Sequence, residues 1–324
     1  MRNFKFLCTV FSSILLIVIF SYIPGVLCQP NSAEDEDMIV ILRGFFIMGL
    51  DEGDLNERPE HEVFVDEFKI DKYEVSAKEF AEFLNEKGNP DDEYFSIDTY
   101  STIIGVSIIE GQVVETKENP EMYVPREGFA NFPANNVSWY GAEAYCRWKG
   151  KRLPSEAEWE KAARGNEKRL YPWGNSLPDN KKARYNQRWE EKGLNVMVPV
   201  DFLDEGVSFY GVYNMAGNVW EWTDDWYRQN YCDYCTPYFE YYKIAARLLE
   251  IEGVPQSTAE NTANEEDMTV PPKDNPEGPD VGSFKVLRGG SWYDSFGELV
   301  IRSTYRYWFY PEDRYLNTGF RCVK

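Results

Sequence analysis

The stretch from Tyr210 to Trp226 places oxygen-bearing side chains among glycines and tryptophans. Asn214 and Glu221 can each offer a side-chain oxygen, and the backbone carbonyls of Gly217 and Val219 would point the same way along an extended segment. Hard cations such as calcium bind roughly six to eight oxygens of this mixed kind. The stretch therefore predicts either a calcium site or a tight turn at Gly217 with Glu221 paired to an arginine.

Other kinds of catalytic centre are restricted by the single histidine, His61. One histidine cannot build a histidine-rich zinc or iron centre, and a Ser-His-Asp triad would depend entirely on it. The setting E-H-E-V-F-V is typical of a histidine at the surface or at a strand edge. The chain also has no G-x-x-x-x-G-K-[ST] loop to hold phosphates. Catalysis by His61 is therefore not expected.

Carboxylates near the C-terminus are a second set of candidates for chemistry. They are Asp294, Glu298 and Asp313. Two carboxylates held together can act as general acid and base. The chain has 55 acidic and 34 basic residues, however, so ion pairs are the more frequent outcome. We expect structural pairing with acids in the core for four arginines: Arg302, Arg306, Arg314 and Arg321.

Seven sequence blocks occur in a fixed order from about residue 39 to the end. They are I-D-K-Y-E-V-S (70–76), N-V-S-W (136–139), G-K-R-L-P-S-E-A-E-W-E (150–160), Y-P-W-G-N (171–175), G-N-V-W-E-W (217–222), V-L-R-G-G-S-W (286–292) and G-F-R-C (319–322). Together they resemble the formylglycine-generating enzyme, or sulfatase-modifying factor, family. The resemblance implies an α+β, loop-rich fold related to the C-type lectin fold, with few helices and small antiparallel sheets.

The same resemblance implies metal sites. The family's first calcium site matches this chain residue by residue at Asn214, Gly217, Val219 and Glu221. Its second calcium site would use Asn186, but the matching acidic position falls near Lys192, so the second site has an incomplete set of ligands. Calcium with a structural role is the expected cofactor.

The family's oxidase chemistry is not expected here. Formylglycine-generating enzymes bind copper through two cysteines after the G-G-S block. In this chain Asp294 stands at the first of these positions, and the second falls near Glu298 or Leu299. No cysteine lies between Cys235 and Cys322. Because copper(I) needs soft thiolate ligands, no copper is expected.

Residues 1–28 have the features of a secretory signal peptide. Two basic residues precede an apolar run from Phe6 to Ile23, and cleavage is expected after Cys28. An uncleaved anchor is an alternative because the run of roughly 18 residues could span a bilayer; a lipid-modified Cys28 is another. In each case the rest of the chain is predicted to be exported, to the periplasm or the cell exterior. It comprises an acidic tail at 29–38 and one domain at 39–324.

Four cysteines remain after residue 28, an even number that suits an oxidising compartment. The family resemblance implies a disulfide between Cys146 and Cys322. The Cys232-Asp233-Tyr234-Cys235 motif could be a redox pair, half of a zinc site or a local disulfide. We favour a structural disulfide, because no second C-x-x-C motif or histidine cluster exists to complete a metal site.

Residue patterns predict the elements that position these groups. Alternating apolar residues predict strands within 39–48 and 62–73. Serine caps predict helices after Ser76, after Ser138 (139–149) and after Ser155 (156–164). We expect long loops with a small hairpin at 91–132 and a loop at 165–199. An insertion is expected at 228–282, with a tyrosine-rich start, a helical pattern around 244–249 and disordered composition at 256–279.

The charge distribution limits the classes of partner. A formal net charge of −21 repels nucleic acid and anionic lipid, and no membrane insertion of the mature domain is expected. We predict a non-oxidase binding, scaffold or assembly component that contacts a protein partner. The candidate contact surface comprises Ser291, Trp292, Tyr293 and Asp294, together with the tyrosine-rich start of the insertion. The alternatives are oxidase activity through other residues and calcium-dependent binding of glycans.

Overall fold

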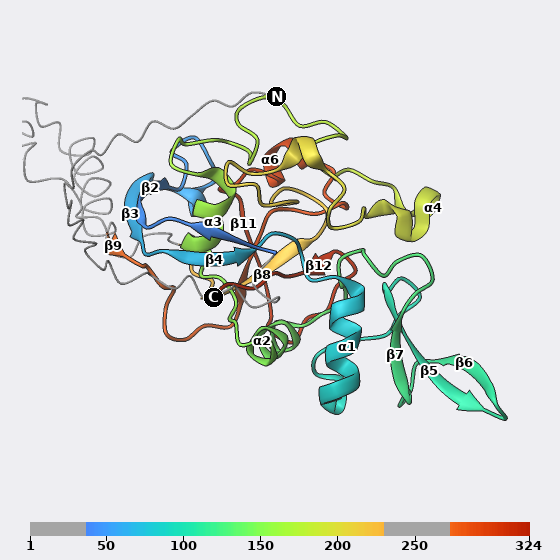
Figure 1. Cartoon of the computed structure of the whole chain (residues 1–324). Coiled ribbons are helices and arrows are strands. Elements are labelled where there is room, and N and C mark those ends of the chain that lie inside the picture. Colours follow the sequence, from blue (N-terminus) through green and yellow to red (C-terminus); the bar gives the residue numbers. More distant parts are fainter. Residues whose placement is uncertain (1–36, 230–272) are drawn as a thin grey trace, which may run out of the picture. The chain divides into compact units, whose positions relative to one another are not determined.

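The computed structural model describes residues 37–229 and 273–324 (Figure 1). The strands are β1 (Met38–Ile41), β2 (Gly44–Met48), β3 (His61–Val65), β4 (Phe68–Asp71), β5 (Ile103–Ile109), β6 (Gln112–Thr116), β7 (Met122–Pro125), β8 (Trp220–Trp226), β9 (Lys273–Asp274), β10 (Lys285–Arg288), β11 (Arg306–Phe309) and β12 (Thr318–Gly319). The helices are α1 (Ala77–Lys87), α2 (Trp139–Trp148), α3 (Glu156–Arg164), α4 (Trp189–Lys192) and α6 (Gly297–Val300). These short elements, joined by long irregular segments, confirm the α+β, loop-rich fold.

The described strands form four small sheets. The largest has the order β11-β10-β8-β12, two have the orders β2-β3-β9 and β6-β5-β7, and β1 pairs with β4 alone. Most of the pairings are antiparallel, as predicted, whereas β3 with β9 and β8 with β12 are parallel. Strand β8 is an inner strand of the four-stranded sheet. The stretch that begins at Asn214 therefore continues into this inner strand, which contains Glu221.

Both predicted strand regions are interrupted in the structure. The first divides into β1 and β2 at Leu42 and Arg43, and the second divides into β3 and β4 at Asp66 and Glu67. The alternation itself is confirmed, because Val63, Val65, Phe68 and Ile70 are buried. Each region contributes to two sheets, with β1 paired to β4 and β2 paired to β3.

The three predicted serine caps are confirmed. At the start of α1, Ser76 Oγ accepts a hydrogen bond from the Glu79 amide, and the Glu79 carboxylate accepts one from the Ser76 amide at 2.9 Å. Such reciprocal bonds satisfy amides that the first helical turn leaves unpaired. Ser155 and Glu158 make the same box at α3, and Ser138 caps α2. Helix α2 ends at Trp148, one residue earlier than predicted.

Aromatic rings make up much of the core around α1. Phe80 lies at the centre, with ring centroids 5.4 Å from Phe83, 5.9 Å from Tyr145 and 5.7 Å from Phe320. These rings come from α1, α2 and the end of the chain, so their packing joins segments that are distant in sequence. Tilted and edge-to-face pairs of this kind contribute about 1 kcal/mol each beyond burial.

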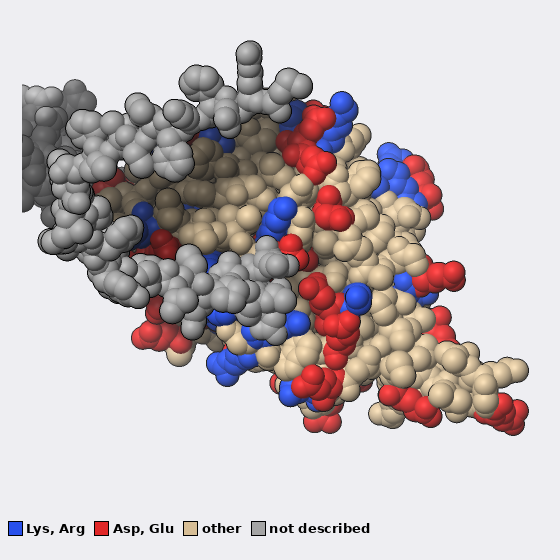
Figure 2. Space-filling view, in the orientation of Figure 1, with Lys and Arg blue, Asp and Glu red and all other residues tan. Residues whose placement is uncertain are grey.

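The region at 91–132 is more regular than predicted. It contains the three-stranded sheet β6-β5-β7, in which Glu110 and Gly111 form the turn between β5 and β6 with φ angles of 52° and 79°. The β5–β6 hairpin extends away from α1, and its surface is mainly uncharged with acidic side chains at one margin (Figures 1 and 2). Val113 on β6 is 73% exposed, whereas Ile103 at the start of β5 is fully buried in the core, so the β6 side of the hairpin lies outside the core.

Buried acids are paired with arginines from the last quarter of the chain. Glu57 binds Arg302 at 2.6 Å, and Glu156 binds Arg306 through two hydrogen bonds of 2.6 and 2.8 Å. These pairs confirm the expected role of Arg302 and Arg306. The expectation was wrong for Arg314, which donates instead to the backbone carbonyls of Asp92 and Glu93.

The predicted insertion, 228–282, is described only at its two ends, residues 228–229 and 273–282. Residues 230–272, which include Cys232, Cys235 and the helical pattern, lie outside the described residues, as do residues 1–36. Residues 273–279 were predicted to be disordered, but they contain β9 and contact the body of the domain. The Asn275 side chain accepts from the Asp66 amide at 2.8 Å, and the Gly278 amide donates to Asp225. In the two described ranges, the helices are too short or too polar to cross a bilayer.

Asp225 is a buried acid whose ionisation should control stability. Burial, followed by the nearby Glu156 carboxylate, raises the pKa of Asp225 to about 7. The folded chain therefore keeps this proton between about pH 4 and pH 7, where the unfolded chain has lost it. As the pH rises from about 4 to about 7, we expect the free energy of unfolding to fall by an amount on the order of 4 kcal/mol at most.

The variant Asp225→Asn should remove this part of the pH dependence while keeping an acceptor for one of the two amides, of Glu156 and Gly278, that donate to the separate oxygens of Asp225. Urea unfolding at three pH values between 4.5 and 7.5 measures the effect. Asp224→Asn is the matched control, because the Asp224 side chain is 56% exposed. Equal slopes with pH for the wild type and Asp225→Asn would contradict this assignment.

Candidate functional site: a buried acidic cluster and an aromatic pocket

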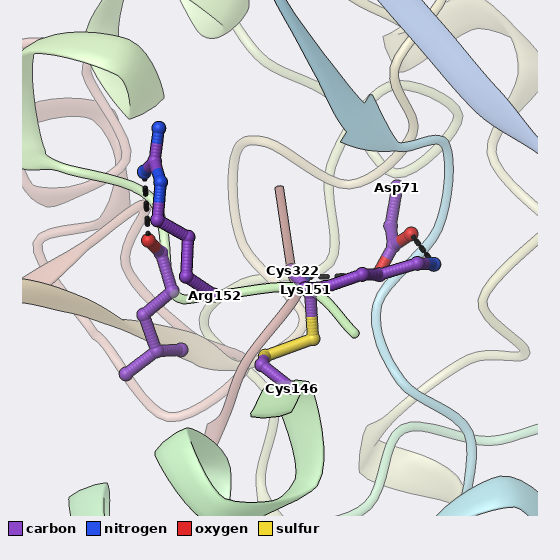
Figure 3. The surroundings of a disulfide bond; sticks show 6 residues. Asp71, Cys146, Lys151, Arg152 and Cys322 are labelled. Atoms are coloured by element: carbon purple, nitrogen blue, oxygen red, sulfur yellow. Dashed lines mark hydrogen bonds and ion pairs between the residues drawn. A yellow bond between two sulfur atoms is a disulfide. The ribbon is translucent and has the colours of Figure 1, made fainter. Parts of the chain in front are cut away.

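A disulfide joins α2 to the end of the chain. Cys146 and Cys322 are bonded, as the family resemblance implied, and their Cα atoms are 5.6 Å apart. Beside the disulfide, the Asp71 carboxylate accepts from Lys151 Nζ at 2.6 Å and from the Cys322 amide at 3.0 Å (Figure 3). The following residue, Val323, is fully buried and makes β-bridges to both Ile70 and Arg152. The last few residues are therefore an integral part of the fold.

Glu74 is a buried carboxylate held by two asparagines. Asn214 Nδ2 donates to Glu74 Oε2 at 2.7 Å, and Asn218 Nδ2 donates to both Glu74 oxygens at 3.1 and 3.0 Å. All three residues are at least 98% buried. Glu74 and Asn218 had no role predicted from the sequence, although both lie in the blocks that carry the family resemblance.

Glu221 belongs to the same buried cluster. Its carboxylate accepts two hydrogen bonds of 2.7 Å from Arg321, and Trp159 Nε1 donates to it at 2.8 Å. The Arg321 pairing is confirmed, and it is the arrangement that the turn interpretation of this stretch required. Gly217 is that turn: its φ is 79°, and a Cβ atom there would lie 2.4 Å from the Arg184 carbonyl oxygen.

The cluster contains more carboxyl groups than cationic groups. Two carboxylates, Glu74 and Glu221, face one guanidinium, Arg321. Burial, followed by the Glu221 charge, raises the pKa of Glu74 to about 8. A buried carboxylate without a direct cationic partner is costly unless a proton or a cation neutralises it.

Asn214 also presents an oxygen without a donor. Its Nδ2 faces two acceptors, Glu74 and the Val200 carbonyl, so its Oδ1 must point the other way. Among the described residues, no donor lies within hydrogen-bond distance of this buried Oδ1. An unpaired carbonyl oxygen beside two carboxyl groups is the kind of ligand that a hard cation binds. Calcium held by Asn214 and Glu221 with the carbonyls of Gly217 and Val219 stays a prediction. Asn214 Oδ1 is available for it, whereas both Glu221 oxygens already accept hydrogen bonds from Arg321 and Trp159.

Calcium should stabilise the folded chain through Asn214. A ligand that binds only the folded state at a hundred times its Kd raises the free energy of unfolding by about 2.7 kcal/mol. We expect a gain of this order for the chelator-treated wild type on addition of calcium, and no gain for Asn214→Leu. Thermal and urea unfolding with and without calcium measure it.

The matched control is Asn135→Leu. Asn135 is also fully buried, but it bonds Thr102, Tyr100 and Leu316. This variant should lose stability while keeping the gain from calcium. A gain that survives in Asn214→Leu would place the cation elsewhere.

The second family calcium site, at Asn186, stays a prediction with incomplete ligands. Asn186 has a φ of 50°, and its amide donates to the Asp294 carbonyl oxygen at 3.2 Å. Lys192 Nζ, near the position of the missing acid, donates to Gln187 Oε1 at 2.5 Å. Within residues 37–229 and 273–324, no group of three or more His, Cys, Asp and Glu side chains is arranged to hold a metal. The loop of Asn186 instead supports the loop of Asp294.

An aromatic pocket lies beside this loop. Its volume is about 550 Å³, and seven of the ten described residues that line it are aromatic. They come from α4, the start of β8, the loop after β10, strand β11 and the loop before β12. The Trp220 and Tyr307 rings stack with centroids 5.3 Å apart, and the Phe309 and Tyr315 rings lie 4.4 Å apart. Segments far apart in sequence therefore form one aromatic surface.

Asp294 is fixed inside this pocket. Its Oδ2 accepts from the Ser291 amide at 2.8 Å and from Ser291 Oγ at 2.7 Å. Burial raises the pKa of Asp294 above its ordinary value. Asn317 Nδ2 donates to Ser291 Oγ at 3.0 Å, which completes a short chain of hydrogen bonds. Of the proposed contact surface, Trp292, Tyr293 and Asp294 line the pocket, and Ser291 supports Asp294 from behind.

The other carboxylates of this region do not join Asp294. Glu298 and Asp313 are absent from the pocket lining, and Asp313 Oδ2 accepts from the Tyr310 amide. Asp294 is the one carboxylate among the described lining residues. His61 lies in β3, the central strand of the β2-β3-β9 sheet, and is partly buried, with Nδ1 2.8 Å from the Pro59 carbonyl oxygen. The pocket thus suits binding better than two-carboxylate acid–base chemistry.

The buried cluster and the pocket are connected through Asn218. Its side chain binds Glu74, and its carbonyl oxygen accepts from the Trp292 amide at 2.9 Å. Two residues further along the chain, Trp220 forms part of the pocket wall. The segment from Asn214 to Glu221 therefore serves both features.

Known proteins resemble the chain over most of its length. It is 31% identical to the formylglycine-generating enzyme of Mus musculus, covering 93% of this chain and 78% of that protein. It is 28% identical to the inactive C-alpha-formylglycine-generating enzyme 2 of Bos taurus, covering 95% and 94% of the two chains. It is 31% identical to the serine/threonine-protein kinase pkn1 of Chlamydia caviae, of whose length it spans only 38%.

A solved structure and a domain family also resemble the chain over most of its length. PvdO from Pseudomonas aeruginosa has the same fold, with a TM-score of 0.57 at 23% identity over 90% of this chain and 95% of that one. The sulfatase-modifying factor enzyme 1-like domain matches residues 26–324. The chain therefore belongs to the sulfatase-modifying factor enzyme 1-like family.

Proposed function

We propose that this chain is an exported, non-oxidase member of its family that binds a partner protein in an extracytoplasmic complex. The observation that carries the proposal is the pocket around Asp294. A carboxylate stands there at the position where the family resemblance places the first copper-binding cysteine. No cysteine lies between residues 235 and 322, and Cys322 is bonded to Cys146. The remaining groups can hold a ligand but cannot supply a pair of thiolates.

The pocket has the composition of a protein contact site. Binding energy in such sites concentrates on buried aromatic side chains with exposed rims. Trp220 and Trp292 are 2% and 4% exposed and form the buried part, whereas Tyr293 is 65% exposed at the edge. A relative named as an inactive formylglycine-generating enzyme supports the idea that the family includes proteins without the oxidase activity.

The binding function is tested by capture of a partner. The chain without residues 1–28 would be used as bait in an extracytoplasmic fraction of the source organism, with Tyr293→Ala as the test variant. We expect loss of at least tenfold in the amount of one specific captured protein. Leu177→Ala is the matched control, since Leu177 is 68% exposed and absent from the pocket lining. Equal capture by the wild type and Tyr293→Ala would contradict a contact at this pocket.

Export is tested separately from binding. When the full chain is expressed in a bacterial host, fractionation and mass spectrometry should find a mature N-terminus at Gln29, outside the cytoplasm. A chain that keeps residues 1–28 and stays with the membrane would support the uncleaved anchor. Cytoplasmic recovery of the intact chain would contradict export.

The rival oxidase function makes distinct predictions. Copper bound at one equivalent per chain, or conversion of a cysteine peptide to an aldehyde, would support it and overturn the proposal. Calcium-dependent glycan binding is a further candidate, because Tyr307 and Trp308 on β11 are 40% and 38% exposed. Glycan binding that a chelator abolishes would favour that candidate over a protein partner.

A further inference from the structure

The chemistry of the aromatic pocket specifies more than a generic contact. Its described lining contains one carboxylate, seven aromatic residues and no basic residue. Aromatic faces carry negative electrostatic potential and attract cations within about 6 Å of the ring centre. A fixed carboxylate among such faces creates a local preference for a positive group. The formal net charge of −21 adds a long-range attraction of the same sign.

The arrangement around Asp294 distinguishes between kinds of cation. Its Oδ2 is already occupied by the amide and hydroxyl of Ser291. A guanidinium group binds best when both carboxylate oxygens are available to its planar fork. An ammonium group acts as a compact charge and needs one oxygen. The geometry at Asp294 thus favours an ammonium group.

We propose that this pocket binds the ammonium group of a lysine side chain presented by the partner protein. The proposal rests on the proposed binding function and specifies the residue that the partner contributes. The aliphatic stem of the lysine packs along the Trp220, Tyr307 and Phe309 rings, and the ammonium group reaches Asp294. Lysine stems commonly cover apolar surface in this way while the charged end meets a polar group.

Small probes test the chemistry without knowledge of the partner. The probes are Nα-acetyl-lysine methylamide, its norleucine counterpart, which has no charge, and its arginine counterpart. Tryptophan fluorescence and NMR titration of the chain without residues 1–28 measure the three affinities. We expect the lysine probe to bind at least tenfold more tightly than the norleucine probe and more tightly than the arginine probe. Equal affinity for the lysine and norleucine probes would overturn the proposal, and a preference for arginine would overturn the choice of ammonium.

The variant Asp294→Asn removes the charge but keeps an acceptor for Ser291. It should weaken binding of the lysine probe at least tenfold and leave binding of the norleucine probe unchanged. Asp313→Asn is the matched control because Asp313 lies outside the pocket lining. Circular dichroism would show that both variants fold. Unchanged affinity of Asp294→Asn for the lysine probe would overturn the proposal.

Partner capture separates this proposal from the one on which it rests. If Tyr293→Ala loses the partner while Asp294→Asn keeps it, the pocket binds a protein but not through an ammonium group. If neither variant changes capture, the proposed function itself fails. Loss of capture in both variants, together with the lysine preference of the probes, supports both proposals.

Discussion

Replacing Arg321 with methionine should destabilise the fold by about 3 to 5 kcal/mol, because it leaves buried acids without their cation. Arg321 is fully buried and donates three further hydrogen bonds to the backbone carbonyls of Asp71, Lys72 and Tyr213. Its loss leaves Glu221 and Glu74 facing each other without a positive charge. Urea unfolding in the presence of chelator measures the effect apart from any bound cation.

A second substitution shows whether charge is the cause. If the unpaired Glu221 accounts for most of the loss, the double variant Glu221→Leu/Arg321→Met should be more stable than Arg321→Met alone. Arg314→Met is the matched control, because Arg314 donates to the exposed backbone carbonyls of Asp92 and Glu93, and we expect it to cost less than about 1 kcal/mol. A cost for Arg321→Met as small as that of Arg314→Met would contradict the account of the cluster.

Removing the disulfide should have an effect of similar size. Cys146 and Cys322 are 176 positions apart in sequence, and closing a loop of this length restricts the unfolded chain. The chain-entropy estimate for such a loop is about 5 kcal/mol at most. The variant Cys146→Ala/Cys322→Ala should therefore unfold at a much lower urea concentration than the wild type.

The remaining cysteines provide the comparison. A local disulfide between Cys232 and Cys235 would close a very short loop, so Cys232→Ser/Cys235→Ser should cost about 2 kcal/mol or less. Adding a reductant to this second variant should then reproduce the large loss through Cys146 and Cys322. If the reductant has no effect on it, the long-range disulfide does not stabilise the chain in solution.

Local signals in the sequence identified local structure. The box of Ser76 and Glu79 and the box of Ser155 and Glu158 each involve residues three positions apart, so both helix starts were predictable. The breaks at Leu42 and Asp66 were missed, because residues 39–42 are uniformly apolar and neither glycine nor proline stands at positions 66 and 67. Strand β9 was missed for a related reason: its pairing with β3 depends on residues about 210 positions away, and its own composition is that of a disordered segment.

The candidate site was likewise predictable only in part. The resemblance to known blocks indicated Asn214, Glu221 and Asp294, and the structure places each of them in the acidic cluster or the pocket. The importance of Glu74 could not be predicted, because its partner Asn214 is 140 positions away. The aromatic lining of the pocket could not be predicted from the sequence either, since Trp220 and Tyr307 meet only after β8 and β11 join the same sheet.

The position of Arg321 and Val323 has a consequence for biosynthesis. The Lys324 backbone exchanges two hydrogen bonds with Lys69, so the end of the chain completes structure that began near its start. The ribosome releases this segment after every other described residue. Until then Glu221 has no counter-ion and Cys146 has no partner thiol, so the native core cannot close during translation. For a chain exported as proposed, the polypeptide can pass through a translocation channel unfolded until residues 319–324 have been synthesised, and folding follows in the compartment where the disulfide forms.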